Sequence, residues 1–511
     1  MKPAVLARLA VAGNRTDHLR TVMTAASAAL AAVTLLAAAT VVAIKGGVQS
    51  WNESGEVSVS KGAEQYASAL LAEAGLRPGV IAVLILLSLP ILALAGQCIR
   101  LGAPARDRRL AAVRLAGATP GQTVLIASAE TVAASLLGSL GGFGLFLLLR
   151  VVLERRNADG KLMLPTDILP SAVSIAVVLL TVPLLAGLIG ALLLRRVVIS
   201  PLGVVRRTRD RSPWPWPGVL IIAGLVLFEL PQHLDDTSPN TAALAAMLSG
   251  GIALTMLGVV LGTGWISYTT GRLLLRFGPR PSMLLAGRRL MADPWNGSRT
   301  LAALLASVVA GAITLGYRAQ LTTEFDAYEQ YNATVTDGTS ASASAPESFY
   351  VGAIDLIMVG VGIGVAVAAA GVLIALVESI VGRRRAYAAL TAVGVPVRTL
   401  SRAVLWQTML PLVPALLLAL GSGIGIARLL GTEVEVGGNS GQTICEAACQ
   451  AGTEAPIIMP ATDPVLTLAV PVPLDLLALL GGGALLALLA AAGIGLLVLR
   501  SSTDLEELRI G

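Results

Sequence analysis

The sequence predicts an all-α integral membrane protein with ten transmembrane helices, on the evidence of its composition and its long apolar stretches. Of its 511 residues, 55% are hydrophobic and only 13% are charged, whereas a soluble domain averages about 25% charged residues. So few charges cannot cover a surface that faces water. A helix needs about 20 apolar residues to cross a bilayer core. Ten stretches meet or approach this length: 21–44, 79–99, 122–149, 169–194, 214–230, 241–268, 300–317, 351–377, 403–427 and 472–499.

The distribution of basic residues predicts that both chain termini are cytoplasmic. Cytoplasmic loops of membrane proteins carry an excess of Lys and Arg. In this orientation, 28 of the 37 Lys and Arg residues lie on the cytoplasmic side and nine lie outside. The first apolar run is too long for the 7–15-residue core of a signal peptide, so we expect it to remain as a span. The Ala-, Gly-, Leu- and Arg-rich composition indicates a bacterial protein, and we expect it in the cell membrane.

Two pairs of segments reveal an internal repeat. Residues 108–130 (RRLAAVRLAGATPGQTVLIASAE) align with residues 385–407 at a constant offset of 277, and residues 6–21 align with 285–300 at an offset of 279. A repeat of four spans keeps both copies in the same orientation, so the repeat is parallel rather than inverted. The predicted organisation is a first four-helix unit, two linking helices and a second four-helix unit, at residues 1–200, 201–280 and 281–511.

Each predicted unit contains a basic cytoplasmic helix that runs into its third span. We call residues 104–118 the first coupling segment and residues 381–396 the second coupling segment. Each contains a glycine, Gly117 or Gly394, at a position suited to end a helix. One interpretation is that a stiff basic helix transmits movement from a cytoplasmic ATPase. The other is that its arginines only obey the positive-inside rule and contact lipid phosphates. The candidate coupling residues are Arg106, Arg108, Arg109, Arg114, Gly117, Arg383, Arg384, Arg385 and Gly394.

These segments resemble the FtsX-like permease domain of bacterial ABC transporters, and the ten-helix, two-domain layout resembles the macrolide and bacitracin exporter type. The matching residues are Arg109, Ala111, Arg114, Gly117, Ala118 and Glu130 in the first copy, and Ala388, Gly394 and Gln407 in the second. The second copy departs from the pattern at Thr391 and Gln407, which replace Arg and Glu. The large outside domain of many relatives is missing.

The resemblance implies a permease subunit that works with two copies of a separate ABC ATPase. ATP and magnesium would bind to that partner, and this chain would need no cofactor. The function implied is export or extraction of a small amphipathic substrate, such as a peptide antibiotic, a drug or a lipid, from surrounding membrane lipids. Antimicrobial peptide resistance is one role that such an exporter would serve.

Polar residues inside predicted spans are the second set of candidates. A charge near the centre of a bilayer costs at least about 2.5 kcal/mol on insertion scales, so Glu130 should face protein or water. It either pairs between the two units, near Gln407, or ties its helix to a neighbour in the same unit. Cys445 and Cys449 lie in the last outside loop and could form a disulfide there.

Glycines with GxxxG spacing recur in the predicted spans, and we expect them to serve helix packing. The three pairs are Gly138 and Gly142, Gly360 and Gly364, and Gly421 and Gly425.

Several function classes lack the motifs that they require. The sequence contains no G-x-x-x-x-G-K-[ST] motif, so we expect no ATP hydrolysis by this chain. Three Cys and two His offer no Cys/His metal cluster, and no nucleic-acid-binding module is evident. Two alternatives remain: a sensor that relays outside signals without transport, and an ion-driven secondary transporter. An ion-driven transporter should carry several ionisable groups along a path through the membrane, and only Glu130 lies clearly inside a predicted span.

Overall fold

The computed structural model describes most of the chain, including nearly all of the predicted spans. The described residues are 15–46, 49–51, 57–59, 63–74, 77–100, 115, 117–158, 160–198, 213–233, 241–334, 347–437, 443–444, 457–458 and 465–501.

Within these residues, nine helices are long and apolar enough to cross a membrane, which confirms an all-α, multi-pass membrane protein. The fifth predicted span, 214–230, corresponds to α8 (Trp216–Glu229), whose 14 residues extend roughly 21 Å, less than the ~30 Å bilayer core. The nine long helices are α2 (Arg15–Ala43), α4 (Arg77–Arg100), α6 (Pro120–Val152), α7 (Ala172–Val198), α9 (Thr241–Phe277), α11 (Pro294–Thr334), α12 (Glu347–Gly382), α14 (Val397–Leu429) and α16 (Leu474–Ser501). The shorter helices are α3 (Ala69–Ala72), η1 (Leu230–His233), α10 (Pro281–Ala292) and α13 (Arg384–Ala392).

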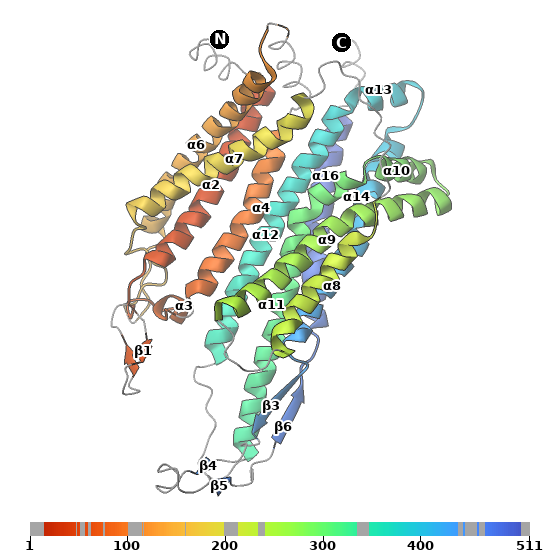
Figure 1. The fold of residues 1–511 in the computed structure, drawn as a ribbon. Helices are drawn as coiled ribbons and strands as arrows, with labels where there is room; N and C mark the ends of the chain where they lie inside the picture. Colours follow the sequence, from red (N-terminus) through yellow and green to blue (C-terminus); the bar gives the residue numbers. More distant parts are fainter. Residues whose placement is uncertain are drawn as a thin grey trace.

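Eight of the nine long helices, all except α9, form two groups of four that lie side by side (Figure 1). In the first group, α2 contacts α4, α6 and α7, and α7 also contacts α4 and α6. In the second group, α11 contacts α12, α14 and α16, and α16 also contacts α12 and α14. The two groups meet mainly where α4 packs along α12, which are the second helices of their groups. The helix pairs in contact are therefore the same in both groups.

The closest helix approach in the first group joins α2 and α6. A Cβ atom placed on Gly138 would collide with the backbone of Ala25, and one on Gly142 would lie 2.5 Å from the Ala29 carbonyl oxygen. These two glycines therefore let the α6 backbone rest on the α2 backbone, which is the packing predicted from their spacing.

The contact between the two groups is looser. A Cβ on Gly360 of α12 would lie 3.8 Å from Val83 of α4, and one on Gly371 would lie 3.7 Å from Leu94. These are ordinary van der Waals distances, so α12 and α4 touch at these positions, but their backbones do not approach as closely as those of α2 and α6.

The largest aliphatic core lies in the second group. It is built from Leu304, Leu305 and Val308 of α11 together with Leu412 of α14 and Leu488 of α16, all of which are fully buried. Lipid tails are as apolar as these side chains, so the core stabilises the second group through van der Waals packing rather than through removal of apolar surface from water.

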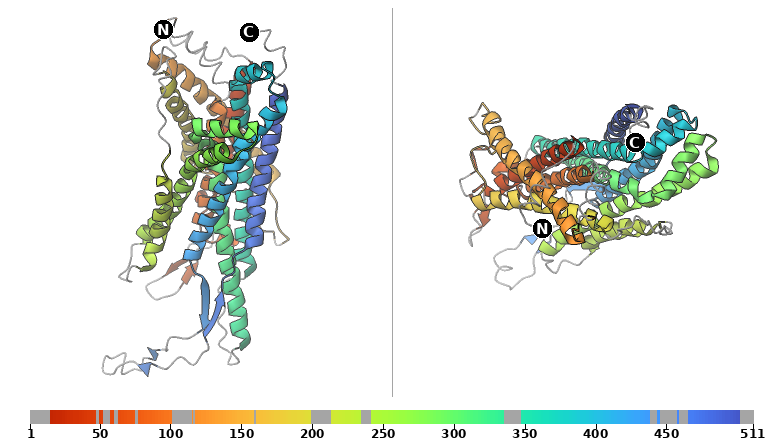
Figure 2. Two further views of the ribbon diagram at one scale, coloured as in Figure 1. Left: turned by 90° about the vertical axis from the view of Figure 1, so that its right-hand side faces the viewer. Right: turned by 90° about the horizontal axis from the view of Figure 1, so that it is seen from above.

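The hairpin formed by α8 and α9 packs on the second group only, because α9 contacts α10, α11 and α14 (Figure 2). Small residues bring the two hairpin helices together. A Cβ on Gly224 of α8 would lie 2.7 Å from the Gly251 carbonyl oxygen of α9. A Cβ on Gly258 of α9 would lie 2.9 Å from the carbonyl oxygen of Pro217.

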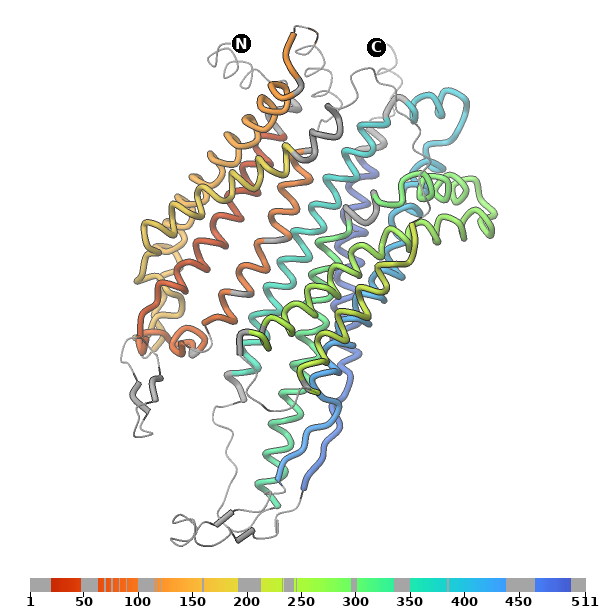
Figure 3. Tube along the Cα trace, in the orientation of Figure 1, coloured from red at the N-terminus to blue at the C-terminus, as the bar shows by residue number. Residues whose placement is uncertain are grey.

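We call the end of the bundle that carries α10 and α13 the basic end; the sequence predicts that it is cytoplasmic. At the opposite end, α11 extends beyond α12 as far as Thr334 (Figure 3), further than the predicted span of 300–317. Ala327 and Tyr331 of this extension are buried against Val436 of strand β3. The helix continues past the apolar span because this sheet covers one of its faces.

Short antiparallel strand pairs also lie at this opposite end. They are β1 (Gln49–Trp51) with β2 (Val57–Val59), β3 (Glu433–Gly437) with β6 (Val465–Ala469), and β4 (Thr443–Ile444) with β5 (Ile457–Ile458).

Side-chain hydrogen bonds hold the loops of the first group at this end. The Tyr66 hydroxyl donates a 2.8 Å hydrogen bond to Asp167. The buried guanidinium of Arg77 donates to the carbonyl oxygens of Ile44, Leu71 and Ala72 at 2.8–3.0 Å.

Candidate functional site

The second coupling segment forms α13 at the basic end, and its sequence explains where the helix stops. Gly394 has a φ of +98°, a backbone conformation that glycine adopts without the steric penalty of a Cβ. The Val395 amide donates to the Leu390 carbonyl oxygen at 3.0 Å, and the Gly394 amide donates to that of Thr391 at 3.0 Å. These two bonds make a Schellman motif with Gly394 at the C′ position, as the sequence predicts.

Only Val395 and Pro396 separate this glycine from the transmembrane helix α14, which begins at Val397. Val395 packs against the buried cluster that includes Leu400 of α14. The connection between α13 and α14 is therefore short and held in place by packing, so a displacement of α13 reaches α14 without a flexible loop between them.

Tyr387 anchors α13 to the bundle. Its side chain is 2% exposed and lies in a cluster with Ile380 of α12 and with Leu400 and Val404 of α14. Leu285 of α10 and Leu496 of α16 also contact this cluster. The buried ring therefore joins the basic ends of four helices to α13.

A polar contact links α13 to α10. Arg289 of α10 donates a 2.6 Å hydrogen bond from Nη1 to the hydroxyl oxygen of Tyr387. Its guanidinium carbon also lies 4.8 Å from the centroid of the Tyr387 ring, within the range of a cation–π contact. Neither residue was among the predicted candidates. The only indication in the sequence was that Tyr387 is the one aromatic residue of α13.

The beginning of α6, after the first coupling segment, also follows a left-handed glycine, but it has a side-chain cap that α14, which starts after Pro396, lacks. Gly117 has a φ of +94°. Thr119 then caps α6, because its hydroxyl accepts from the Gln122 amide at 3.3 Å and the Gln122 side chain accepts from the Thr119 amide at 3.0 Å. The predicted candidates Arg106, Arg108, Arg109 and Arg114 lie outside the described residues.

The two coupling segments share one exposed feature. Leu115 is 90% exposed and Val393 is 85% exposed, and each stands within two residues of the left-handed glycine of its segment. Isolated exposed apolar residues are common on protein surfaces. Val393 directly precedes its glycine and Leu115 lies two residues before its own, and we call these two residues the apolar tips of the basic end.

The basic residues of the second coupling segment surround the start of α13. Arg383 is the N-cap residue and is exposed. Arg384 and Arg385 belong to the first turn of α13, but their side chains lie outside the described set.

Glu130 forms an ion pair within the first unit. Its Oε1 lies 2.7 Å from Nη2 of Arg20 on α2, and the two side chains are 12% and 6% exposed. The contact joins the first and third spans of one unit, rather than the two units, so the structure favours the interpretation in which Glu130 ties neighbouring helices together. Gln407 lies half-buried on α14.

The alignment offset of 279 places Arg299 in the second copy where the first has Arg20. The sequence shows that this arginine is repeated, because an Arg-Thr pair ends both aligned segments. It does not show that Arg20 pairs with Glu130.

Two remaining expectations concern cysteines and metals. Cys445 and Cys449 lie outside the described residues. Over the residues that the structure describes, no group of three or more His, Cys, Asp or Glu side chains is arranged to hold a metal ion.

Comparison with known protein families identifies the part of the chain that holds the second coupling segment. Residues 358–503 match the model of the FtsX-like permease C-terminal family. This stretch contains most of α12, all of α13 and α14, and all of α16. A search of curated proteins found no match to the chain.

The FtsX-like domain indicates a membrane protein of the ABC-permease type or a related one. Proteins of this family generally work with ABC ATPase partners. The matched range begins within α12, so it does not include the first unit or the linking hairpin.

Proposed function

We propose that this protein is the permease subunit of a bacterial ABC transporter of the macrolide and bacitracin exporter type, with ten transmembrane helices and cytoplasmic termini. Two copies of a separate ATPase subunit would bind ATP and magnesium and contact the two coupling segments. The permease would export or extract a small amphipathic substrate from the membrane. The observation that carries this proposal is the FtsX-like domain with α13 joined directly to a transmembrane helix.

Correspondence between the two groups of helices supports two FtsX-like units. Helices α6 and α14 begin at residues 120 and 397 and end at 152 and 429, a constant offset of 277. The left-handed glycines, Gly117 and Gly394, have the same offset. The same pairs of helices are in contact in both groups. Two similar units facing each other across α4 and α12 would offer two similar sites to two ATPase subunits.

The apolar tips indicate where the ATPase would bind. Leu115 and Val393 stand at the ends of the coupling segments, next to glycines that fix the backbone direction. Burial of these two side chains on the ATPase would remove exposed apolar surface from water, which favours binding by about 25 cal/mol per Å².

The ion pair of Glu130 weighs against an ion-driven transporter. Such a transporter needs an intramembrane carboxylate that loads and releases an ion or a proton. Here the one carboxylate that lies clearly inside a predicted span is held 2.7 Å from Arg20.

Affinity purification from native membranes in mild detergent tests the proposal. We expect a chain with a G-x-x-x-x-G-K-[ST] motif to co-purify at two copies per permease. Val393→Glu should reduce the recovered ATPase, whereas Phe277→Glu, at another exposed apolar position of the basic end, should not. Absence of an ATPase from the wild-type preparation, together with proton-coupled flux in vesicles, would contradict the proposal. An ATPase that co-purifies without substrate transport would support the sensor alternative.

A further inference from the structure

The second coupling segment is linked to α10 by two side chains whose residue types are not repeated in the first unit. In the second unit, Arg289 of α10 both hydrogen-bonds to Tyr387 of α13, at 2.6 Å, and lies over its ring, at 4.8 Å. The internal alignment places Ala10 and Leu110 at the equivalent positions of the first unit. Neither of these side chains can form a hydrogen bond or a cation–π contact.

α10 is itself firmly fixed to the bundle. Ala286 and Leu290 are buried against Leu274 of α9, with Trp406 of α14 beside them. Gly287 lies so close to α9 that a Cβ on it would be 2.8 Å from the carbonyl oxygen of Gly271. A contact that fixes α13 to α10 therefore also fixes α13 to the linking hairpin and to α14.

We propose that Arg289 and Tyr387 are positioning residues that join α13 and α10 into one rigid body, so that movement of the second coupling segment reaches the linking hairpin as well as α14. This inference rests on the proposed function, because it assumes that an ATPase moves α13. Movement of α13 is passed to α9, α10 and α14 together in the second unit.

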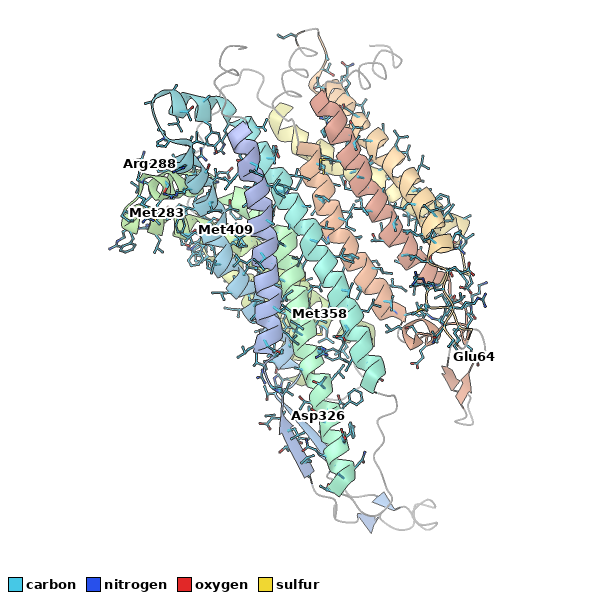
Figure 4. The ribbon with its side chains drawn as sticks, turned by 180° about the vertical axis from the view of Figure 1, so that it is seen from behind. Glu64, Met283, Arg288, Asp326, Met358 and Met409 are labelled. Carbon is cyan, nitrogen blue, oxygen red and sulfur yellow. The ribbon has the colours of Figure 1, made fainter. Side chains whose placement is uncertain are left out.

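Two exposed residues at the end opposite the basic end allow this movement to be measured. Glu64 lies in the loops of the first unit and Asp326 lies on the α11 extension of the second (Figure 4). Spin labels at these positions, on a chain with its three native cysteines replaced by serine, report the distance between the units. The sample is the full chain with its co-purified ATPase in lipid nanodiscs, measured without nucleotide and with ATP trapped by vanadate.

The variants separate the contact from general changes in charge or packing. Tyr387→Phe removes the hydroxyl but keeps the buried ring, and Arg289→Gln removes the cation. Arg288→Gln is the matched control, because it removes the same charge from the neighbouring, exposed position of α10. Arg289→Lys retains a cation above the ring and should restore part of the effect.

In the wild type and in Arg288→Gln, we expect trapped ATP to shift the Glu64–Asp326 distance distribution. In Tyr387→Phe and Arg289→Gln, the ratio of shifted to unshifted molecules should fall about fivefold, as expected for the loss of one hydrogen bond, while the same amount of ATPase co-purifies. A wild-type shift retained in both variants would overturn the inference while leaving the proposed function intact. Loss of ATPase binding in Tyr387→Phe would also overturn it, because Tyr387 would then act in binding. A wild type that recovers no ATPase would instead contradict the proposed function.

Discussion

The ion pair between Arg20 and Glu130 gives the sharpest prediction about stability. Both side chains are nearly buried, at 6% and 12% exposure, and their charged atoms lie 2.7 Å apart. Replacing Glu130 with Leu removes this ion pair from the buried guanidinium. Removing one member of a buried pair costs about 3–5 kcal/mol, so Glu130→Leu should strongly lower the stability of the first unit.

Two further variants test whether the loss of the charged partner, rather than a change in packing, lowers the stability of Glu130→Leu. Glu130→Gln keeps an oxygen that can accept from Arg20 and loses only the charge, so it should cost about 1–2 kcal/mol, the difference between charged and neutral hydrogen bonds. The double variant Arg20→Leu/Glu130→Leu removes both charges. Replacing a whole buried pair with apolar residues is often neutral or stabilising, so the double variant should be more stable than Glu130→Leu alone.

The free energies of unfolding of these variants can be compared in mixed micelles. The purified protein is titrated with sodium dodecyl sulfate, and unfolding is followed by circular dichroism. We expect stability to rise from Glu130→Leu, through Glu130→Gln, to the double variant and the wild type. If the double variant is no more stable than Glu130→Leu, the cost lies in packing and the electrostatic reasoning is refuted.

Three other predictions concern helix packing, backbone conformation and pH. Gly142→Leu should cost at least about 1–3 kcal/mol by overpacking the α6–α2 contact, whereas Gly141→Leu, where a new Cβ meets nothing within 4 Å, should cost little in the same unfolding assay. Gly394→Ala should lower stability by about 1–2 kcal/mol, because φ at this position is +98°, and equal stability would contradict the assigned helix end. Burial, with the nearby Asp167 carboxylate, raises the pKa of Tyr66 above its ordinary value of 10.0. The stability that this hydroxyl contributes should therefore be complete below pH ~10 and lost as pH rises further; Tyr66→Phe should abolish that part of the pH dependence.

The sequence alone determined the class of the protein and the order of its helices. Apolar runs of about 20 residues cannot remain in water, so composition and run length predicted the membrane helices without any knowledge of packing. The ends of α13 and the start of α6 were also predictable, because a left-handed glycine and a capping threonine act on the local backbone. The spacing of Gly138 and Gly142 correctly indicated a close helix contact.

Other features depended on which helices become neighbours, and only the tertiary structure decided them. The GxxxG spacing of Gly421 and Gly425 looks the same in sequence, yet a Cβ on Gly421 meets nothing within 4 Å. The partner of Glu130 is more than 100 residues away, on a helix whose rotation about its axis is set by packing. Arg289 and Tyr387 are 98 residues apart and belong to two short helices, of which α10 is held against α9 and α14. Local sequence patterns report how a segment folds, but contacts between distant segments depend on the free energy of the whole assembly.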